Sequence, residues 1–225
     1  MGATGLEVHS SGQNLNIEHY KMLFNILYEE HNNYCNKQIK PDGKEFNLKR
    51  TCICDIYESG KGLEENFYKY VIDYLHGFNE LEHKILFNIY EKNVVHIRVR
   101  TKEFTSIIYK IDNKSKQQNG KFPISKCLND LLGFRIVDNN YNDNIAYVRN
   151  YLEYLIEDKY KHRIRYVNQN NDNYKGDHIY FLGQDNKFFP MELQIWNREY
   201  EQKNIESHSK YKQEYLKWLK EYNKF

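Results

Sequence analysis

Apolar residues recur at helical spacing in the first third of the chain, which predicts two helical regions. The first covers residues 17–34, with Asn16 as its N-cap. The second covers residues 63–92 and is interrupted at Gly77. Between them, the sequence Pro41-Asp42-Gly43 predicts a turn.

From residue 94 onward, short alternating segments lie between helical ones. Alternation with period two predicts strands over residues 94–100, 133–137, 163–167, 178–182 and 188–196. Helical periodicity predicts helices over residues 103–116, 125–132 (capped by Ser125), 141–158 and 199–222. Residues 169–173 are predicted to form a polar loop. The order favours an α+β fold, with a mixed, largely antiparallel sheet packed by helices and a helical N-terminal extension.

The chain is expected to divide into three parts. Residues 1–14 lack periodicity and are expected to be a flexible tail. Residues 15–92 form the helical N-terminal region, and residues 93–225 form the domain that carries the chemistry.

Composition is that of a folded domain and excludes several classes of protein. Hydrophobic residues make up 40% and aromatic residues 16% of the chain, which argues against disorder. The sequence has neither a membrane-length apolar run nor a secretory pattern, so we expect a cytoplasmic protein without a membrane partner. The formal net charge is +2, so any contact with nucleic acid would need a local basic patch. The four cysteines provide no disulfide framework, and the spacing of Cys52 and Cys54 is not that of a zinc site.

A cationic group follows the first predicted strand. Arg100, Lys102, Ser106 and Lys110 would converge where this strand meets the next helix, which is suitable for binding a polyphosphate. The alternative is an exposed, solvated basic face.

An acidic and a basic residue flank the start of the strand at residues 133–137. Asp130 precedes the strand and Arg135 lies within it, and burying either charge is costly unless it is paired or binds a ligand. The pair is therefore either part of a site or an ion pair between the two residues.

Two further segments combine polar and aromatic residues. Tyr174 and His178 flank Gly176 in a predicted polar loop, where the ring could stack on a nucleobase or lie on the sheet as in a plain hairpin. Glu192 and Gln194 share a strand face with Trp196, which would suit a metal or a sugar hydroxyl. The alternative for this strand is a solvent-facing sheet edge.

The order and spacing of these residues resemble the synthetase domain of the RelA/SpoT family. The motifs are Arg-x-Lys-x3-Ser-x3-Lys from Arg100, Asp-x2-Gly-x-Arg-Ile from Asp130, Tyr-x-Gly-x-His from Tyr174, Glu-x-Gln-Ile from Glu192, and His-x2-Tyr-Lys from His208. The resemblance covers about residues 94–212. It implies a nucleotidyltransferase-like synthetase fold and transfer of pyrophosphate from ATP to the 3′-hydroxyl of GTP or GDP, which makes pppGpp or ppGpp.

The resemblance also implies where ATP would bind. Arg100 and Arg135 would sandwich the adenine, and Lys102, Ser106 and Lys110 would hold the phosphates.

For catalysis, the resemblance implies that Asp130 and Glu192 bind Mg²⁺ and that Glu192 accepts the proton of the attacking hydroxyl. Tyr174 would stack on the acceptor base. Further residues expected on the acceptor side are Lys175, His178, Gln194, Arg163 and Arg165.

The chain departs from the family in ways that leave the acceptor open. The N-terminal third has no His-Asp pair of the alarmone hydrolase type, so the resemblance is to a small single-domain synthetase. Trp196-Asn197 stands where many members have Arg-Thr, and the strand before the base-stacking loop reads Arg163-Ile164-Arg165-Tyr166 where many have Asp-Tyr.

Some similar small members are toxins that pyrophosphorylate the 3′-terminal adenosine of tRNA, and others make adenosine alarmones. A basic run could contact RNA phosphates, or could simply be a solvated helix end: Lys159, Lys161, His162, Arg163 and Arg165. An antitoxin partner and a homo-oligomer are both compatible with the resemblance.

Overall fold

The computed structural model describes residues 13–37, 45–92 and 96–222. Its helices are α1 (Ile17–Lys37), α2 (Glu65–His76), α3 (Phe78–Glu91), α4 (Phe104–Ser115), α5 (Ile124–Cys127), α6 (Tyr141–Tyr154) and α7 (Glu201–Tyr222). Its strands are β1 (Tyr57–Glu58), β2 (Gly62–Leu63), β3 (Arg98–Thr101), β4 (Leu132–Asp138), β5 (Ile164–Asn171), β6 (Tyr174–Phe181) and β7 (Met191–Asn197). The turn expected at residues 41–43, residues 1–12 of the expected tail and the start of the strand expected at residue 94 lie outside the described residues.

The predicted helix boundaries in the N-terminal region have local causes. The Asn16 side chain accepts hydrogen bonds from the backbone N–H groups of Glu18 (3.0 Å) and His19 (3.1 Å), so it caps α1 as predicted. Gly77 separates α2 from α3, also as predicted.

The main sheet has five strands in the order β3-β4-β7-β6-β5. Only the β4–β7 pair of this sheet is parallel, and the other three pairs are antiparallel. This confirms the predicted mixed, largely antiparallel sheet. β1 and β2 form a separate two-stranded sheet.

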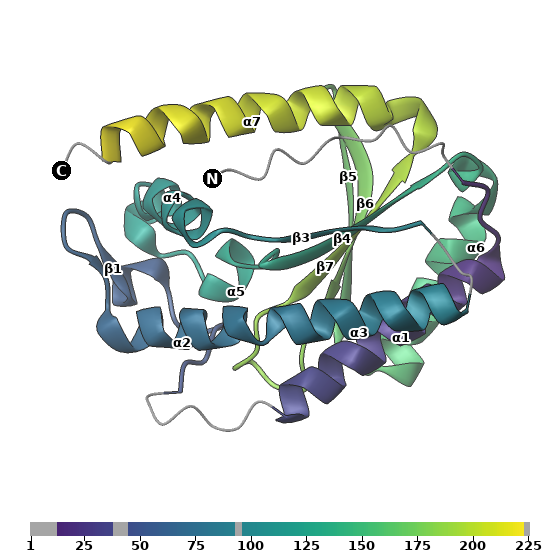
Figure 1. Ribbon diagram of the computed structural model, residues 1–225, viewed down its shortest axis with the longest axis horizontal. Helices are drawn as coiled ribbons and strands as arrows, with labels where there is room; N and C mark the ends of the chain where they lie inside the picture. Colours follow the sequence, from purple (N-terminus) through teal and green to yellow (C-terminus); the bar gives the residue numbers. More distant parts are fainter. Residues whose placement is uncertain (1–12, 38–44, 93–95, 223–225) are drawn as a thin grey trace.

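Helices cover both faces of the main sheet. In Figure 1, α7 runs along one side of the molecule, whereas α1, α2 and α3 lie on the opposite side of the strands. The core on the α1–α3 side contains side chains from helices and strands alike, including Phe24, Leu27, Phe134 and Ile195. A smaller cluster of Val137, Tyr174 and Trp196 lies on the other face, where Ile205 of α7 packs against it.

Two predicted elements are wrong. The short helix α5 starts after Pro123 rather than at Ser125, and it ends before Leu128, whose φ of −105° and ψ of 64° are not helical. The apolar residues that follow are buried in the core and enter β4, which had been expected to begin only at Gly133.

The polar loop expected at residues 169–173 is mostly strand. β5 continues to Asn171 and pairs there with Tyr174, which leaves a two-residue turn whose Asn173 N–H donates to the Asn171 side chain (3.0 Å). Polar residues are tolerated because β5 is an edge strand and its end is exposed.

No helix among the residues described is both long enough and apolar enough to span a membrane.

Candidate active site

The face of the sheet toward α7 carries the polar residues predicted from the sequence. Because side chains alternate along a strand, Leu193 and Ile195 enter the main core while Glu192 and Gln194 lie on the other face. β7 lies between β4 and β6, so the alternative of a solvent-facing edge strand is wrong.

Strand pairing places one residue from each strand in a single row across this face. Arg100 pairs with Gly133, Gly133 with Glu192, Glu192 with Tyr180, and Tyr180 with Arg165. At about 4.8 Å between neighbouring strands, the two arginines are about 19 Å apart along the row. Glu192 therefore lies midway between two cationic edges.

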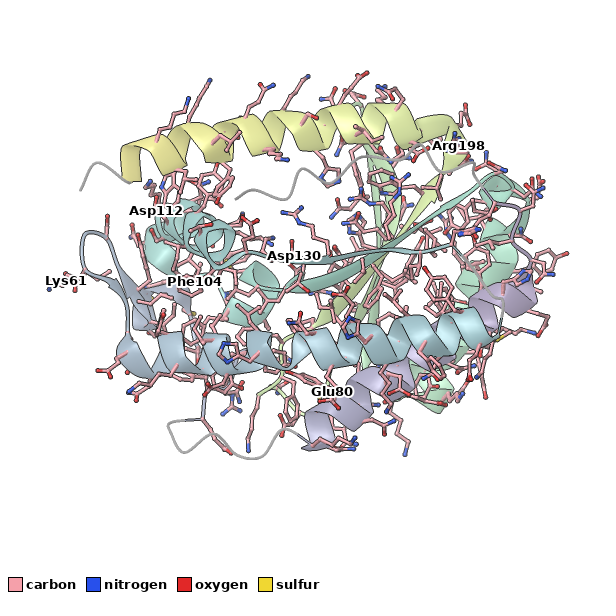
Figure 2. All side chains as sticks on the ribbon, in the orientation of Figure 1. Lys61, Glu80, Phe104, Asp112, Asp130 and Arg198 are labelled. Atoms are coloured by element: carbon pink, nitrogen blue, oxygen red, sulfur yellow. The ribbon has the colours of Figure 1, made fainter. Side chains whose placement is uncertain are left out.

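At one end of the row, two lysines hold Asp130. Lys110 Nζ lies 2.9 Å from Asp130 Oδ1, and Lys102 Nζ contacts Asp130 Oδ2. Burial alone would raise the pKa of Asp130, but the charges of Lys110 and Lys102 outweigh burial and hold this pKa well below its usual range. Figure 2 places Asp130 in the middle of the molecule, between α7 and the α2–α3 pair. The partners of Asp130 are thus lysines, and the alternative of an ion pair with Arg135 is wrong.

Ser106, expected to hold a phosphate, and Arg100, expected to contact the adenine, lie on the same two elements, α4 and β3. Ser106 is half-buried in the first turn of α4, two residues after the helix begins. Arg100 is exposed on β3. The structure thus brings four sequence-predicted residues to the junction of β3 and α4, with an anion already present there in Asp130.

Arg135 lies in the next row and is held by three side chains. Its guanidinium stacks 3.6 Å above the Trp196 ring, and its Nε donates to Gln194 Oε1 at 3.0 Å. Its terminal nitrogen lies 3.4 Å from His208 Nε2 on α7. Burial lowers the pKa of Arg135 to about 10, and burial together with the Arg135 charge lowers the pKa of His208 to about 4.

Glu192 is buried and hydrogen-bonded through both carboxylate oxygens. His178 Nδ1 lies 2.8 Å from Oε1, and Gln194 Nε2 donates to Oε2 at 2.8 Å. His178 Nε2 in turn lies 2.8 Å from the Tyr174 hydroxyl, which accepts from Trp196 Nε1 at 2.8 Å. Glu192 is therefore connected to a buried polar network that extends three rows away, as far as Tyr174.

Comparison with known proteins identifies the family. Residues 99–215, just over half of the chain, match the family described as the region found in RelA/SpoT proteins. The chain belongs to the RelA/SpoT family. The protein is accordingly a pyrophosphotransferase of the RelA/SpoT synthetase type.

Similar solved structures include two of small alarmone synthetase 1 from Bacillus subtilis. The one bound to its product pppGpp is 19% identical, covers 68% of this chain and 82% of its own, and has a TM-score of 0.40. The other is 20% identical, covers 60% of this chain and 73% of its own, and has a TM-score of 0.37. A GTP pyrophosphokinase family protein from Streptococcus pneumoniae is 16% identical, covers 60% and 71%, and has a TM-score of 0.38. No curated protein matches the chain.

Tyr174 of this RelA/SpoT protein was expected to lie in a polar loop, but it lies in a strand. It begins β6 and is only 7% exposed, with its ring edge-to-face against Trp196 and His208. Burial raises the pKa of Tyr174 to about 12. The Tyr174 ring thus lies on the sheet, which is the alternative given for this segment. Stacking of the ring on a nucleobase remains a prediction.

The other acceptor-side residues are divided between two places. Lys175 lies beside the start of α7: its Nζ is 4.4 Å from the centre of the ring of Tyr200, the residue before α7, and its backbone N–H donates to Asn204 of α7. Arg163 is half-buried just before β5. Arg165 stacks 4.5 Å from the centre of the Tyr180 ring, and its buried Nε has no hydrogen-bond partner among the described residues.

Three residues in or beside the site were missed as site residues: Trp196, Tyr180 and Asn204. Trp196 shares the face of Glu192 by simple alternation, and the same rule places Tyr180 beside His178, so the pattern contained that signal. Asn204 had no such signal: its side chain accepts from Lys175 N–H (2.9 Å) and donates to Lys175 C=O (2.7 Å), which fastens α7 to β6.

RelA/SpoT synthetases depend on nucleotides and typically use a divalent metal. In the described part of the chain, no group of three or more His, Cys, Asp or Glu side chains could hold a metal ion. Mg²⁺ is commonly bound by one or two carboxylates together with substrate phosphates. Asp130 and Glu192 offer such oxygens. A Cβ atom added at Gly133 would lie 3.8 Å from Glu192 Oε2, so the glycine leaves space beside the Glu192 carboxylate. The donor set fits Mg²⁺ that arrives with a nucleotide.

Proposed function

We propose that this protein transfers the β,γ-pyrophosphate of ATP to the 3′-hydroxyl of GDP or GTP and so makes ppGpp or pppGpp. The observation that carries the proposal is the row across the sheet, where Glu192 lies midway between the cations of the β3–α4 junction and Arg165. A donor polyphosphate and an acceptor nucleotide are both anionic, and each would have cations on its own side of the carboxylate.

In the reaction, the 3′-oxygen of the acceptor forms a bond to the β-phosphorus of ATP. The bond from that phosphorus to the oxygen bridging to the α-phosphate breaks, and AMP leaves. Glu192 takes the proton of the attacking hydroxyl. Its place on a central strand holds it rigidly, which favours alignment of the reacting groups.

The lysines would stabilise charge on the transferred group. In the structure they neutralise Asp130, and ATP phosphates would compete with that carboxylate for them. Asp130 and Glu192 would hold Mg²⁺, which neutralises phosphate charge and orients the phosphates when bound. Arg100 and Arg135 would lie over the adenine, and Ser106 would contact a phosphate near the start of α4.

On the acceptor side, Tyr174 would face the base, and His178, Gln194 and Lys175 would position the nucleotide. Arg165 is well suited to an acceptor phosphate because its buried Nε donor lacks a partner among the residues described.

A second candidate acceptor is the 3′-terminal adenosine of tRNA, as for a toxin countered by an antitoxin. The observation that favours it is the continuation of the basic run toward the site face. Lys161 and His162 form a turn with positive φ (47° and 63°) just before Arg163 and β5, and Arg165 follows on the site face. Lys159, however, is already bonded to Asn25 on α1 (2.7 Å).

The deciding experiment offers γ-labelled ATP with GDP, ATP or bulk tRNA and measures which acceptor becomes labelled. We expect labelled ppGpp from GDP. Arg165→Ala should lower transfer to every acceptor because it removes a cation from the site face.

The double change Lys159→Ala and Lys161→Ala separates the two acceptors. It should spare GDP, whereas a tRNA acceptor should lose labelling and show a shallower salt dependence, because each lost phosphate contact reduces the log–log slope by about 0.9 or less. Labelling of tRNA but not GDP would overturn the proposal in favour of the second candidate. Absence of any label transfer would contradict both.

A further inference from the structure

Four side chains from β6 and β7 form a continuous hydrogen-bonded chain. It runs from Trp196 Nε1 to the Tyr174 hydroxyl, from there to His178 Nε2, and from His178 Nδ1 to Glu192 Oε1, with 2.8 Å at each step. All four residues are buried, so water does not compete for these bonds.

The chemistry of the two ends favours one arrangement of the protons. An indole N–H can only donate, so Trp196 occupies one acceptor position of the Tyr174 oxygen and favours the orientation in which the Tyr174 hydroxyl donates to His178 Nε2. At the other end, Nδ1 faces a carboxylate oxygen of Glu192, which favours a hydrogen on Nδ1, and the Tyr180 hydroxyl lies 3.5 Å from the same nitrogen. One tautomer of His178 satisfies both ends, with N–H at Nδ1 and a lone pair at Nε2.

The Trp196 ring is itself fixed by its packing. The Arg135 guanidinium lies 3.6 Å over one face, and the His208 ring stacks at 5.5 Å with an interplanar angle of 29°. A Cβ at Gly176 would come within 2.9 Å of Trp196 Cδ1, so β6 approaches the indole closely because residue 176 is glycine.

We infer that Trp196 is a positioning residue for Glu192: through Tyr174 it fixes the His178 tautomer, and the Nδ1–H of that tautomer holds the carboxylate in one orientation. Trp196 lies four residues along β7 from Glu192 and is connected to it through Tyr174 and His178. Its effect on transfer rests on the proposed function, whereas the tautomer can be measured without any substrate.

The first test observes the histidine directly, by ¹⁵N NMR of protein labelled in its histidine side chains, with His178→Asn used to assign the resonances. The wild type should show His178 protonated at Nδ1 only. Trp196→Phe keeps a ring but removes the N–H, which frees the Tyr174 hydroxyl to reorient, and the His178 signals should move toward a mixture of the two tautomers.

Trp218→Phe is the matched control because Trp218 Nε1 also donates a hydrogen bond, to Asp112 at 3.2 Å, and lies on α7 away from this network. Its His178 signals should equal those of the wild type. A wild-type His178 protonated at Nε2 would overturn the inference, as would a Trp196→Phe protein with unchanged signals.

The second test uses kinetics and does not depend on how well Trp196→Phe folds. The amide N–H of an Asn side chain lies close to the position of the Nδ1–H of a histidine. The amide N–H of the longer Gln side chain lies close to the position of the Nε2–H. His178→Asn should therefore keep at least tenfold more kcat than His178→Gln, with the KM for ATP within twofold of wild type in both. Equal kcat values, or a better His178→Gln protein, would overturn the inference, because His178 would then act through Nε2. If no acceptor is labelled at all, the proposed function fails while the NMR result still decides the tautomer.

Discussion

At the scale of single residues, Asp130 makes two ion pairs in the site. Its carboxylate is shared by Lys102 and Lys110, and Lys102 is almost fully buried. Burial lowers the pKa of Lys102. The pKa of Lys110 is raised, because the negative charge of Asp130 outweighs the burial of Lys110. Removing the carboxylate would leave two neighbouring ammonium groups without their counter-charge.

Asp130→Asn should therefore abolish pyrophosphate transfer and lower the free energy of unfolding by about 3–5 kcal/mol at pH 7. The folded-state pKa of Asp130 is depressed, so its stabilisation is present above the unfolded pKa of about 3.9 and is lost as the pH falls through the folded value. The stability difference from wild type should thus persist at pH 5 and shrink below about pH 4. Urea unfolding at pH 7, 5 and 3 measures it.

Asp172→Asn is the matched control because Asp172 is exposed in the turn between β5 and β6. It should leave activity and stability unchanged. A folded Asp130→Asn protein with substantial activity would remove Asp130 from the proposed machinery.

At the scale of elements, two glycines on the site face have different surroundings. A Cβ at Gly176 of β6 would lie 2.9 Å from Trp196 Cδ1 and 3.0 Å from the Tyr174 hydroxyl. A Cβ at Gly133 of β4 would meet nothing closer than 3.8 Å. One glycine allows close packing of side chains, and the other leaves space beside Glu192.

The two alanine variants should therefore fail in different ways. Gly176→Ala should lower the free energy of unfolding by about 1–3 kcal/mol because the indole and the phenol must move apart. Gly133→Ala should unfold like wild type but transfer pyrophosphate more slowly, since its methyl group enters the substrate side of Glu192. Thermal unfolding and label transfer, measured on both proteins, distinguish these outcomes. Equal stability of the two variants would contradict the close approach at Gly176.

The elements were predictable from sequence wherever local pattern determined them. Asn16 and Gly77 act locally, and the alternation in residues 191–197 placed Glu192 and Gln194 correctly. Asn171 was misassigned to a loop because a polar edge strand has no apolar alternation to mark it. Pairing of Asp130 with two lysines was not predictable either, because it depends on how β3, α4 and the start of β4 meet in three dimensions. The burial of Tyr174 has the same kind of cause, since α7 covers it from a distant part of the chain.

At the scale of the whole molecule, the N-terminal helices and the sheet share one continuous core. Leu27 of α1 and Ile195 of β7 belong to the same buried cluster. The proposed division at residues 92 and 93 therefore separates parts that bury their apolar side chains against each other.

Leu27→Ala should destabilise the entire molecule by about 2–5 kcal/mol because it leaves a cavity in this shared core. Unfolding followed by tryptophan fluorescence, which reports on Trp196 and Trp218, should coincide with unfolding followed by circular dichroism. Leu216→Ala on α7 is the control, since Leu216 is 45% exposed and its loss should change stability by about 0.5 kcal/mol or less. Separate transitions would mean that the helical region unfolds independently.

The single parallel pair of the main sheet has a consequence for the order in which this protein folds. β4 ends at Asp138 and β7 begins at Met191. These two strands can therefore pair only after the chain between them has closed a long loop. Closing such a loop costs entropy before its contacts repay it, and non-local pairing of this kind slows folding. Arg100 and Gly133 can meet early through the antiparallel β3–β4 pair, whereas Glu192 can join them only after this closure. The catalytic centre should thus be among the last regions to form during folding.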